Sequence, residues 1–137
     1  MIFQQDLNKN PRILLNHLLA APFIYFQIIP LIFSDISTEI YHRICFPLYG
    51  LPYVKRGKYI KIDRHKLSYL TTFEKINCVY CGYGNGLLHY LSAIAGESEK
   101  YWCGIAHAKR AGFIPQEHQK DFLPYGDKKA FDEFVNK

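Results

Sequence analysis

No Asp, Glu, Lys or Arg occurs between Ile13 and Phe33, although charged residues make up 21% of the whole chain. A charge-free apolar stretch of this length suffices for a bilayer-crossing helix, which needs about 20 residues. The stretch contains Pro22 and Pro30, which break helices in water but are better tolerated in membranes. Three structures stay open: a membrane-spanning helix, an anchor that lies in the membrane plane or is half inserted, and a buried soluble hairpin of helices.

The motifs of several common enzyme classes are also missing. The chain has no G-x-S-x-G elbow and no H-E-x-x-H zinc motif. The glycine-rich stretch at 82–86 lacks both the G-x-G-x-x-G spacing and the lysine of a phosphate-binding loop. No internal repeat is visible, so a solenoid or propeller is not indicated.

What the chain does have is enough apolar material for one folded domain. It has 137 residues, and its aromatic share of 16% excludes intrinsic disorder. The net charge of +5 suits a partner with negative charge, such as nucleic acid or an anionic membrane face. We expect a mainly α-helical protein with an apolar N-terminal helix or helical hairpin at 1–34, which docks on a membrane or partner. A compact metal-binding helical domain follows at 35–137.

The expected elements of this domain follow from capping residues and apolar spacing. A helix is predicted from Ser34 or Asp35 to Cys45, and Pro47 is expected to end it. A short β-hairpin is predicted over 53–62 and a glycine-rich loop over 78–86. Further helices are predicted over 86–95 with Gly96 as the stop, over 98–111, near 115–121, and from Asp127 to Val135 with Phe131, Phe134 and Val135 facing inward.

The strongest chemical signal is a set of cysteines and one histidine. Cys78 and Cys81 form a C-x2-C pair typical of a zinc knuckle. If 98–111 is helical, Cys103 and His107 lie on one face of that helix, one turn apart. Three thiolates and one imidazole would make a tetrahedral zinc site. Four protein ligands leave no open position, so its role would be structural.

Cys45 keeps the choice of ligands and metal open. It could replace His107 as the fourth ligand, and four thiolates would also hold iron or an iron–sulfur cluster. The C-x2-C pair could instead be a redox dithiol or two plain buried thiols.

A second constellation involves carboxylates and histidines. Glu39 and His42 lie one helical turn apart, and Glu99 lies one turn before Cys103. With His107, these residues could hold a non-haem metal. The simpler interpretation is that the carboxylates are solvated and the histidines support them.

A basic segment lies just before the middle of the chain, with Tyr53 and Tyr59 near its cations. Such a surface can bind anionic lipid or single-stranded nucleic acid, or simply face water. Its members are Lys55, Arg56, Lys58, Lys61, Arg64 and Lys66.

Three stretches resemble a family of small bacterial proteins: YHRICFPLYGLP at 41–52, KINCVYCGYGNGL at 75–87 and EKYWCGIAHAKR at 99–110. The resemblance implies a bacterial source. It brings no established activity, so it assigns no role to any residue.

Together these observations favour a small zinc-binding protein that associates with a membrane and acts as an adaptor or accessory interaction protein. Its expected place is the cytoplasmic side of the bacterial inner membrane, or the cytoplasm. Its expected partner is the membrane surface, a membrane protein or another protein. The alternatives are an iron-dependent redox protein or enzyme, and a nucleic-acid-binding module.

Overall fold

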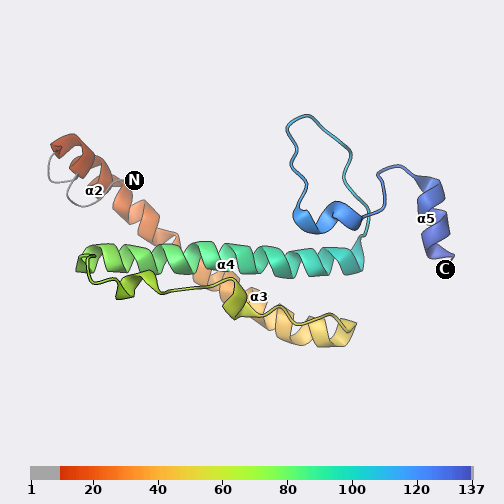
Figure 1. Ribbon diagram of the computed structural model, residues 1–137, viewed down its shortest axis with the longest axis horizontal. Helices are drawn as coiled ribbons and strands as arrows, with labels where there is room; N and C mark the ends of the chain where they lie inside the picture. Colours follow the sequence, from red (N-terminus) through yellow and green to blue (C-terminus); the bar gives the residue numbers. More distant parts are fainter. Residues whose placement is uncertain (1–9, 137) are drawn as a thin grey trace.

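The computed structural model describes residues 10–136, which form helices and no β-strand. The prediction of a mainly α-helical chain is confirmed. Figure 1 shows the longest helix as a central rod, with the C-terminal segment at its far end. The elements are α2 (Pro11–Phe26), α3 (Ile28–Tyr49), η1 (Arg56–Lys58), η2 (Arg64–Lys66), α4 (Thr72–Trp102), η3 (Glu117–Asp121) and α5 (Lys128–Val135), where η denotes a 3₁₀ helix.

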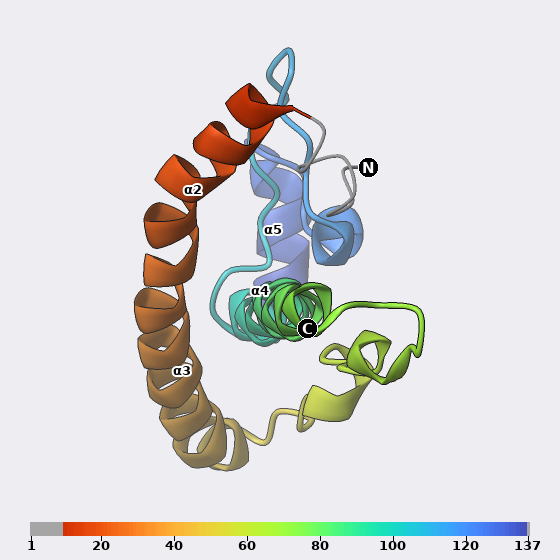
Figure 2. The same ribbon diagram turned by 90° about the vertical axis from the view of Figure 1, so that its left-hand side faces the viewer.

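α2 and α3 follow each other almost without a break. The side chain of Asn10 accepts a hydrogen bond from the backbone N–H of Arg12 and so caps α2. Pro11 fills the first helical position, where a backbone donor would have no partner anyway. Gln27 alone separates the two helices, and its backbone angles are helical. The two helices therefore form one arc, which curves around one side of α4 in Figure 2.

The prediction that a helix starts at Ser34 or Asp35 is wrong, because α3 already begins at Ile28. The boundary expected between the N-terminal segment 1–34 and the domain 35–137 therefore falls inside α3. A hairpin of two helices within 13–33 is also absent from the described structure, since the chain runs on in one general direction (Figure 1).

The expectation that Pro47 ends the helix is wrong as well. α3 continues to Tyr49 and ends at Gly50, whose φ of 65° lies in the left-handed region that favours glycine. A proline removes one helical hydrogen bond, but packing can offset this loss in the last turn. The Tyr49 ring stacks on that of Tyr101 in α4, with centroids 4.9 Å apart.

α4 passes straight through a stretch expected to be a loop. The Thr71 hydroxyl oxygen caps it by accepting from the backbone N–H of Glu74, and the Glu74 carboxylate accepts in turn from the backbone N–H of Thr71. The loop predicted at 78–86 is wrong because these residues are helical, and Gly96 does not stop the helix, which continues to Trp102.

The glycines of α4 are explained by close packing. A Cβ on Gly86 would lie 2.8 Å from the Cα of Ile60 and 2.9 Å from the carbonyl oxygen of Tyr59. A Cβ on Gly82 would lie 3.1 Å from the carbonyl oxygen of Lys61. The segment between α3 and α4 thus lies directly on the helix backbone at positions where side chains are absent.

The β-hairpin predicted over 53–62 is wrong, because this segment packs on the glycines of α4. The segment turns through η1, where the N–H of Ile60 bonds to the carbonyl of Arg56 at 3.1 Å. It then runs back along α4 instead of pairing with itself (Figure 1).

α3 and α4 run in the same direction and enclose a small core. Tyr25, near the end of α2, bonds to Asn77 near the start of α4, and Tyr41 of α3 bonds to Ser98 further along α4. The buried apolar core residues are Phe46, Val54, Leu87, Tyr90 and Ile94.

The C-terminal part is mostly irregular. The helix predicted over 98–111 is wrong beyond Trp102, and a single β-bridge joins Ile105 to Leu123. The short helix predicted near 115–121 is confirmed as η3, and the last one as α5. The expected inward face of α5 is wrong, because it has too little protein beside it. The exposed fractions are 44% for Phe131, 65% for Phe134 and 62% for Val135.

Candidate functional site

The most extensive surface feature is an apolar stripe on the outer face of α2 and α3. Its members recur every three or four residues, so they share one side of the helix. Each of these side chains is at least 55% exposed. We name this set the outer stripe: Leu15, Leu19, Phe26, Ile29, Phe33, Ile36, Ile40 and Ile44.

The outer stripe has no partner within the described part of the chain. α2 contains no buried residue, and α3 buries only His42 and Phe46, both on the side towards α4. With Pro22 filling the gap between Leu19 and Phe26, the stripe extends for about 45 Å at the helical rise. An apolar surface of this size on one face of a helix marks an interaction site.

Helix Pro11–Tyr49, taken as one, is the one described helix long and apolar enough to cross a membrane. It has 39 residues, and none of its most apolar window is buried. This finding rests on length and composition, which a soluble core helix can also satisfy. A soluble core helix would, however, be largely buried.

The inner face of the same helix carries a polar network centred on His42, which is completely buried. The backbone N–H of Val54 donates to its Nε2 at 3.1 Å. Because Nε2 accepts, the ring proton belongs on Nδ1, which donates to the hydroxyl oxygen of Tyr90 at 3.1 Å. Burial lowers the pKa of His42, so the ring is neutral.

Aromatic rings enclose this histidine. The ring of Tyr53 stacks on it at 3.9 Å between centroids, and Phe46 meets it edge-on at 4.4 Å. His42 thus fills a core position and also holds the incoming segment through Val54.

Glu39 closes the network. The Tyr90 hydroxyl donates to one carboxylate oxygen at 2.9 Å, and Arg43 and Tyr53 donate to the other at 2.8 and 3.1 Å. Burial opposes ionisation, but these donors outweigh it and hold the pKa of Glu39 below its ordinary value. Burial and the hydrogen bond to Glu39 raise the pKa of Tyr90.

A second carboxylate lies one turn before Glu39. Asp35 forms a bidentate pair with Arg56, with Nη2 and Oδ2 at 2.6 Å, and accepts from the Tyr83 hydroxyl at 2.8 Å. The hydrogen bond from Arg56 lowers the pKa of Asp35. Burial and Asp35 raise the pKa of Tyr83 to about 12.

These groups border a shallow hollow of about 500 Å³ that contains Asp35, Glu39, Arg43 and Arg56. Every charge in it has an opposite charge or a donor in contact. The network therefore joins α3, the segment after it and α4. The contacts explain its geometry without a bound ligand.

The structure does not bring the expected metal ligands together. Among residues 10–136, no group of three or more His, Cys, Asp or Glu lies close enough to hold a metal. Cys78 and Cys81 are on one helix rather than in a knuckle. Cys103 ends that helix about 33 Å further along, given the helical rise. Metal binding by these thiols stays a prediction that needs another arrangement of the chain.

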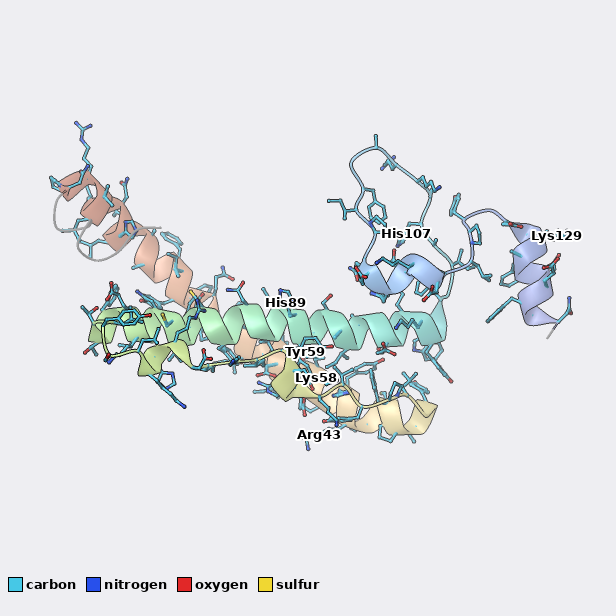
Figure 3. The ribbon with its side chains drawn as sticks, in the orientation of Figure 1. Arg43, Lys58, Tyr59, His89, His107 and Lys129 are labelled. Atoms are coloured by element: carbon cyan, nitrogen blue, oxygen red, sulfur yellow. The ribbon has the colours of Figure 1, made fainter. Side chains whose placement is uncertain are left out.

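Cys45 and His107 are also separate from the C-x2-C pair. Cys45 lies near the end of α3, which runs parallel to α4, whereas Cys78 lies near the start of α4. His107 lies on the loop beyond α4, as Figure 3 shows. Because residues 103–111 are not helical, His107 does not share a helical face with Cys103.

Of the second constellation, the structure joins Glu39 and His42 through Tyr90 but leaves Glu99 apart. Glu99 is about 14 Å further along α4 than Tyr90. It contacts the Nε2 of His118 at 2.5 Å and accepts from Gln119 at 2.9 Å. These two contacts hold η3 against α4. The sequence contains no pattern that predicts them.

The basic segment lies across α4 from the arc of α2 and α3 (Figure 2). Arg56 is withdrawn into the pair with Asp35, and Lys61 is 3.3 Å from Asp63. The other members, Lys55, Lys58, Arg64 and Lys66, are exposed.

The sequence analysis missed the tyrosines of the network. A usable signal was present, because Tyr83 and Tyr90 are seven residues apart and therefore share a helix face. Asp35, Glu39 and His42 likewise lie at spacings of three and four.

Comparison of the chain with models of protein families, with curated proteins and with solved structures found no match.

Proposed function

We propose that this protein is a membrane-surface adaptor, anchored by the outer stripe of α2 and α3 lying in the plane of one leaflet. The observation that carries the proposal is the exposure of every stripe residue on a helix with no charge between Ile13 and Phe33. Each Leu, Ile or Phe side chain fully removed from water contributes about 1.5–3 kcal/mol. Such a surface binds the interface between headgroups and acyl chains.

The packing of α4 favours an in-plane anchor over a full span. Ile28, inside the apolar run, borders the same groove as His65 and Lys75. A bilayer that enclosed residues 13–33 would draw these polar groups into hydrocarbon, where a Lys costs about 2.5–3.5 kcal/mol at mid-depth. With the helix in plane, they remain on the aqueous side.

The same orientation leaves the basic segment on the side away from the lipid, where it is available to an acidic protein partner. Arg43 is the cation beside the outer stripe, and Figure 3 shows it on α3 away from α4. It suits the headgroup layer. We place the protein on the cytoplasmic face of a bacterial inner membrane.

Vesicle flotation tests this function. The double variant I29E/I36E adds two charges to the stripe, and L88E/I114E adds the same charge at exposed positions outside it. Wild type and the control should float with vesicles of mixed neutral and anionic lipid, and the stripe variant should not. Equal flotation of all three would refute the proposal. A shift of the stripe variant from dimer to monomer in vesicle-free buffer would instead identify the stripe as a protein interface.

A further inference from the structure

A groove lies along the second half of α4, on the side away from the α2–α3 arc. Its walls are the segment around η1 and the segment around η3, which flank α4 in Figure 2. The groove has a volume of about 830 Å³, and its floor runs along α4 from His89 to Lys100. That distance is about 16 Å at the helical rise, the length of about five residues of extended chain.

Both walls are seated directly on the helix. At the first wall, a Cβ on Gly86 would lie 2.9 Å from the carbonyl oxygen of Tyr59. At the second wall, a Cβ on Gly96 would lie 2.8 Å from the Nδ1 of His118, whose Nε2 contacts Glu99 at 2.5 Å. The groove is therefore formed before a ligand arrives, and the small side chains of Ser92 and Ala93 leave its floor open between the walls.

The η1 wall belongs to the basic segment, whose uncompensated charge has one sign. Arg56 is paired with Asp35 and Lys61 with Asp63, so two of the six cations are neutralised. The other four are exposed, and within residues 10–136 no carboxylate lies at ion-pair distance from them: Lys55, Lys58, Arg64 and Lys66. Of these, Lys55 and Lys58 border the groove.

The carboxylates of the groove do not cancel this charge. Glu97 contacts Lys100 at 2.8 Å, and Glu117 contacts Lys120, so each is paired within its own helix. The remaining carboxylate, Asp121, belongs to η3 and therefore to the opposite wall. A negatively charged ligand is attracted by the η1 wall and repelled by Asp121, which gives it one preferred position in the groove.

The tyrosines of the basic segment favour a protein ligand over single-stranded nucleic acid. The ring of Tyr53 stacks on that of His42, with centroids 3.9 Å apart. The half-buried ring of Tyr59 packs against that of Tyr90 at 6.1 Å. Binding of single strands relies on rings that are free to stack with bases, and these two rings are engaged with the core.

We infer that this groove binds an extended acidic segment of a protein partner, with the carboxylates along Lys55 and Lys58 and the backbone over Ser92 and Ala93. Further acidic residues of the partner lie towards Arg64, because the basic segment runs from the groove back along α4 (Figure 1). The inference rests on the adaptor function proposed above and names the partner. The groove and the outer stripe lie on opposite sides of the molecule, so both can be occupied together.

Selection from a phage-displayed library of random peptides tests the site. The full chain is the target, in buffer without vesicles. Selection should enrich peptides that carry runs of Asp and Glu, and an enriched peptide with a fluorescent label should bind the chain in an anisotropy titration. Its affinity should fall as salt is added, because the charges on both sides are exposed to solvent.

Two pairs of variants locate the binding surface. K55E/K58E reverses the charge of the η1 wall, and K128E/K129E makes the same change at exposed positions of α5, outside the groove. The first should weaken peptide binding at least about tenfold and the second should change it little. S92W fills the groove floor, whereas A95W places the same ring at an exposed position of α4 outside the groove. S92W should likewise lose at least about tenfold, and A95W should keep the affinity.

A library that yields no acidic peptides, or equal losses within either pair of variants, would overturn the inference. So would an oligothymidylate that binds more tightly than the peptide and depends equally on Lys55 and Lys58, since the surface would then be a nucleic-acid site. The assay contains no lipid, so its failure leaves the flotation result intact, and failed flotation leaves this assay intact.

Discussion

The Nδ1 atom of His42 lies 3.1 Å from the hydroxyl oxygen of Tyr90, 48 positions along the chain, and both side chains are fully buried. The hydroxyl also donates to Glu39, so one oxygen atom connects a neutral ring on α3 with a carboxylate on the same helix. Helices that meet mainly through a small core depend on such connections for their relative position.

Y90F should therefore destabilise the protein by about 1–3 kcal/mol, because the ring is kept while the buried Nδ1 of His42 loses its partner and Glu39 loses one of its three donors. Urea unfolding followed by circular dichroism measures this. Y69F is the control: Tyr69 is 77% exposed, and its change should stay within about 0.5 kcal/mol. Equal effects of the two substitutions would contradict the role of the network.

Acid should weaken the fold in two steps. His42 has its pKa lowered by burial from the ordinary 6.5, so the unfolded chain takes up a proton first and stability falls as the pH drops below 6.5. Glu39 and Asp35 have pKa values below 4.5 and 3.8, so their contribution, present above those values, is lost as the pH falls through the lowered ones.

The H42Q variant separates the two steps. Glutamine does not titrate, so the unfolding free energy of H42Q should decline less than that of wild type between pH 6.5 and 5, and similarly below pH 4.5. Identical slopes in the upper range would mean that His42 is not the group responsible.

Close packing at Gly86 predicts opposite results for two glycines of one helix. G86A places a Cβ against the backbone of Ile60 and should cost about 1–3 kcal/mol as an overpacked substitution. G84A meets only the flexible end of Leu31 at 3.4 Å, so the better helix propensity of alanine, about 1 kcal/mol, should dominate. Thermal melts of both variants would show it. A more stable G86A would mean that residues 59–61 do not lie on α4.

The cysteines allow a decision between this structure and the zinc hypothesis. Cys81 and Cys103 are exposed and do not meet, so C81S and C103S should each change stability by less than about 0.5 kcal/mol. A structural zinc site would instead make either variant unfold and would show about one zinc per chain in elemental analysis. Metal analysis of wild type and C81S on the same day would be enough.

The helical class of the chain and its apolar N-terminal element could be predicted because periodicity and the absence of charge act locally. The terminal helix that starts after Asp127 was predicted for the same reason. The outer stripe was visible in part, since Ile36, Ile40 and Ile44 stood out by their spacing.

The errors came from long-range packing. Glycines at 82, 84 and 86 favour a loop when isolated, but here they form the surface on which residues 59–62 lie. Pro47 would end the helix in an isolated peptide. In the folded chain α3 continues past it to Tyr49, whose ring stacks on that of Tyr101 in α4. The C-x2-C spacing carries no information on whether its backbone is a turn or a helix, so the knuckle followed from an assumption about 78–86.

Depth measurements should distinguish an in-plane anchor from a span. A fluorophore attached to a single cysteine at position 19, 29 or 40, in a background without the native cysteines, reports its depth by quenching from lipids brominated along the acyl chain. An in-plane helix places Leu19, Ile29 and Ile40 at similar shallow depths, because all three belong to one stripe. A spanning helix would carry them through different depths, with one label near the bilayer centre.

A label at Leu88, which is as exposed but lies off the stripe, is the control, and it should remain unquenched if the helix lies in plane. A steep gradient from 19 to 40 would reject the in-plane arrangement and require α4 to separate from Ile24 and Tyr25, whose hydrogen bonds with Tyr80 and Asn77 now hold the two helices together.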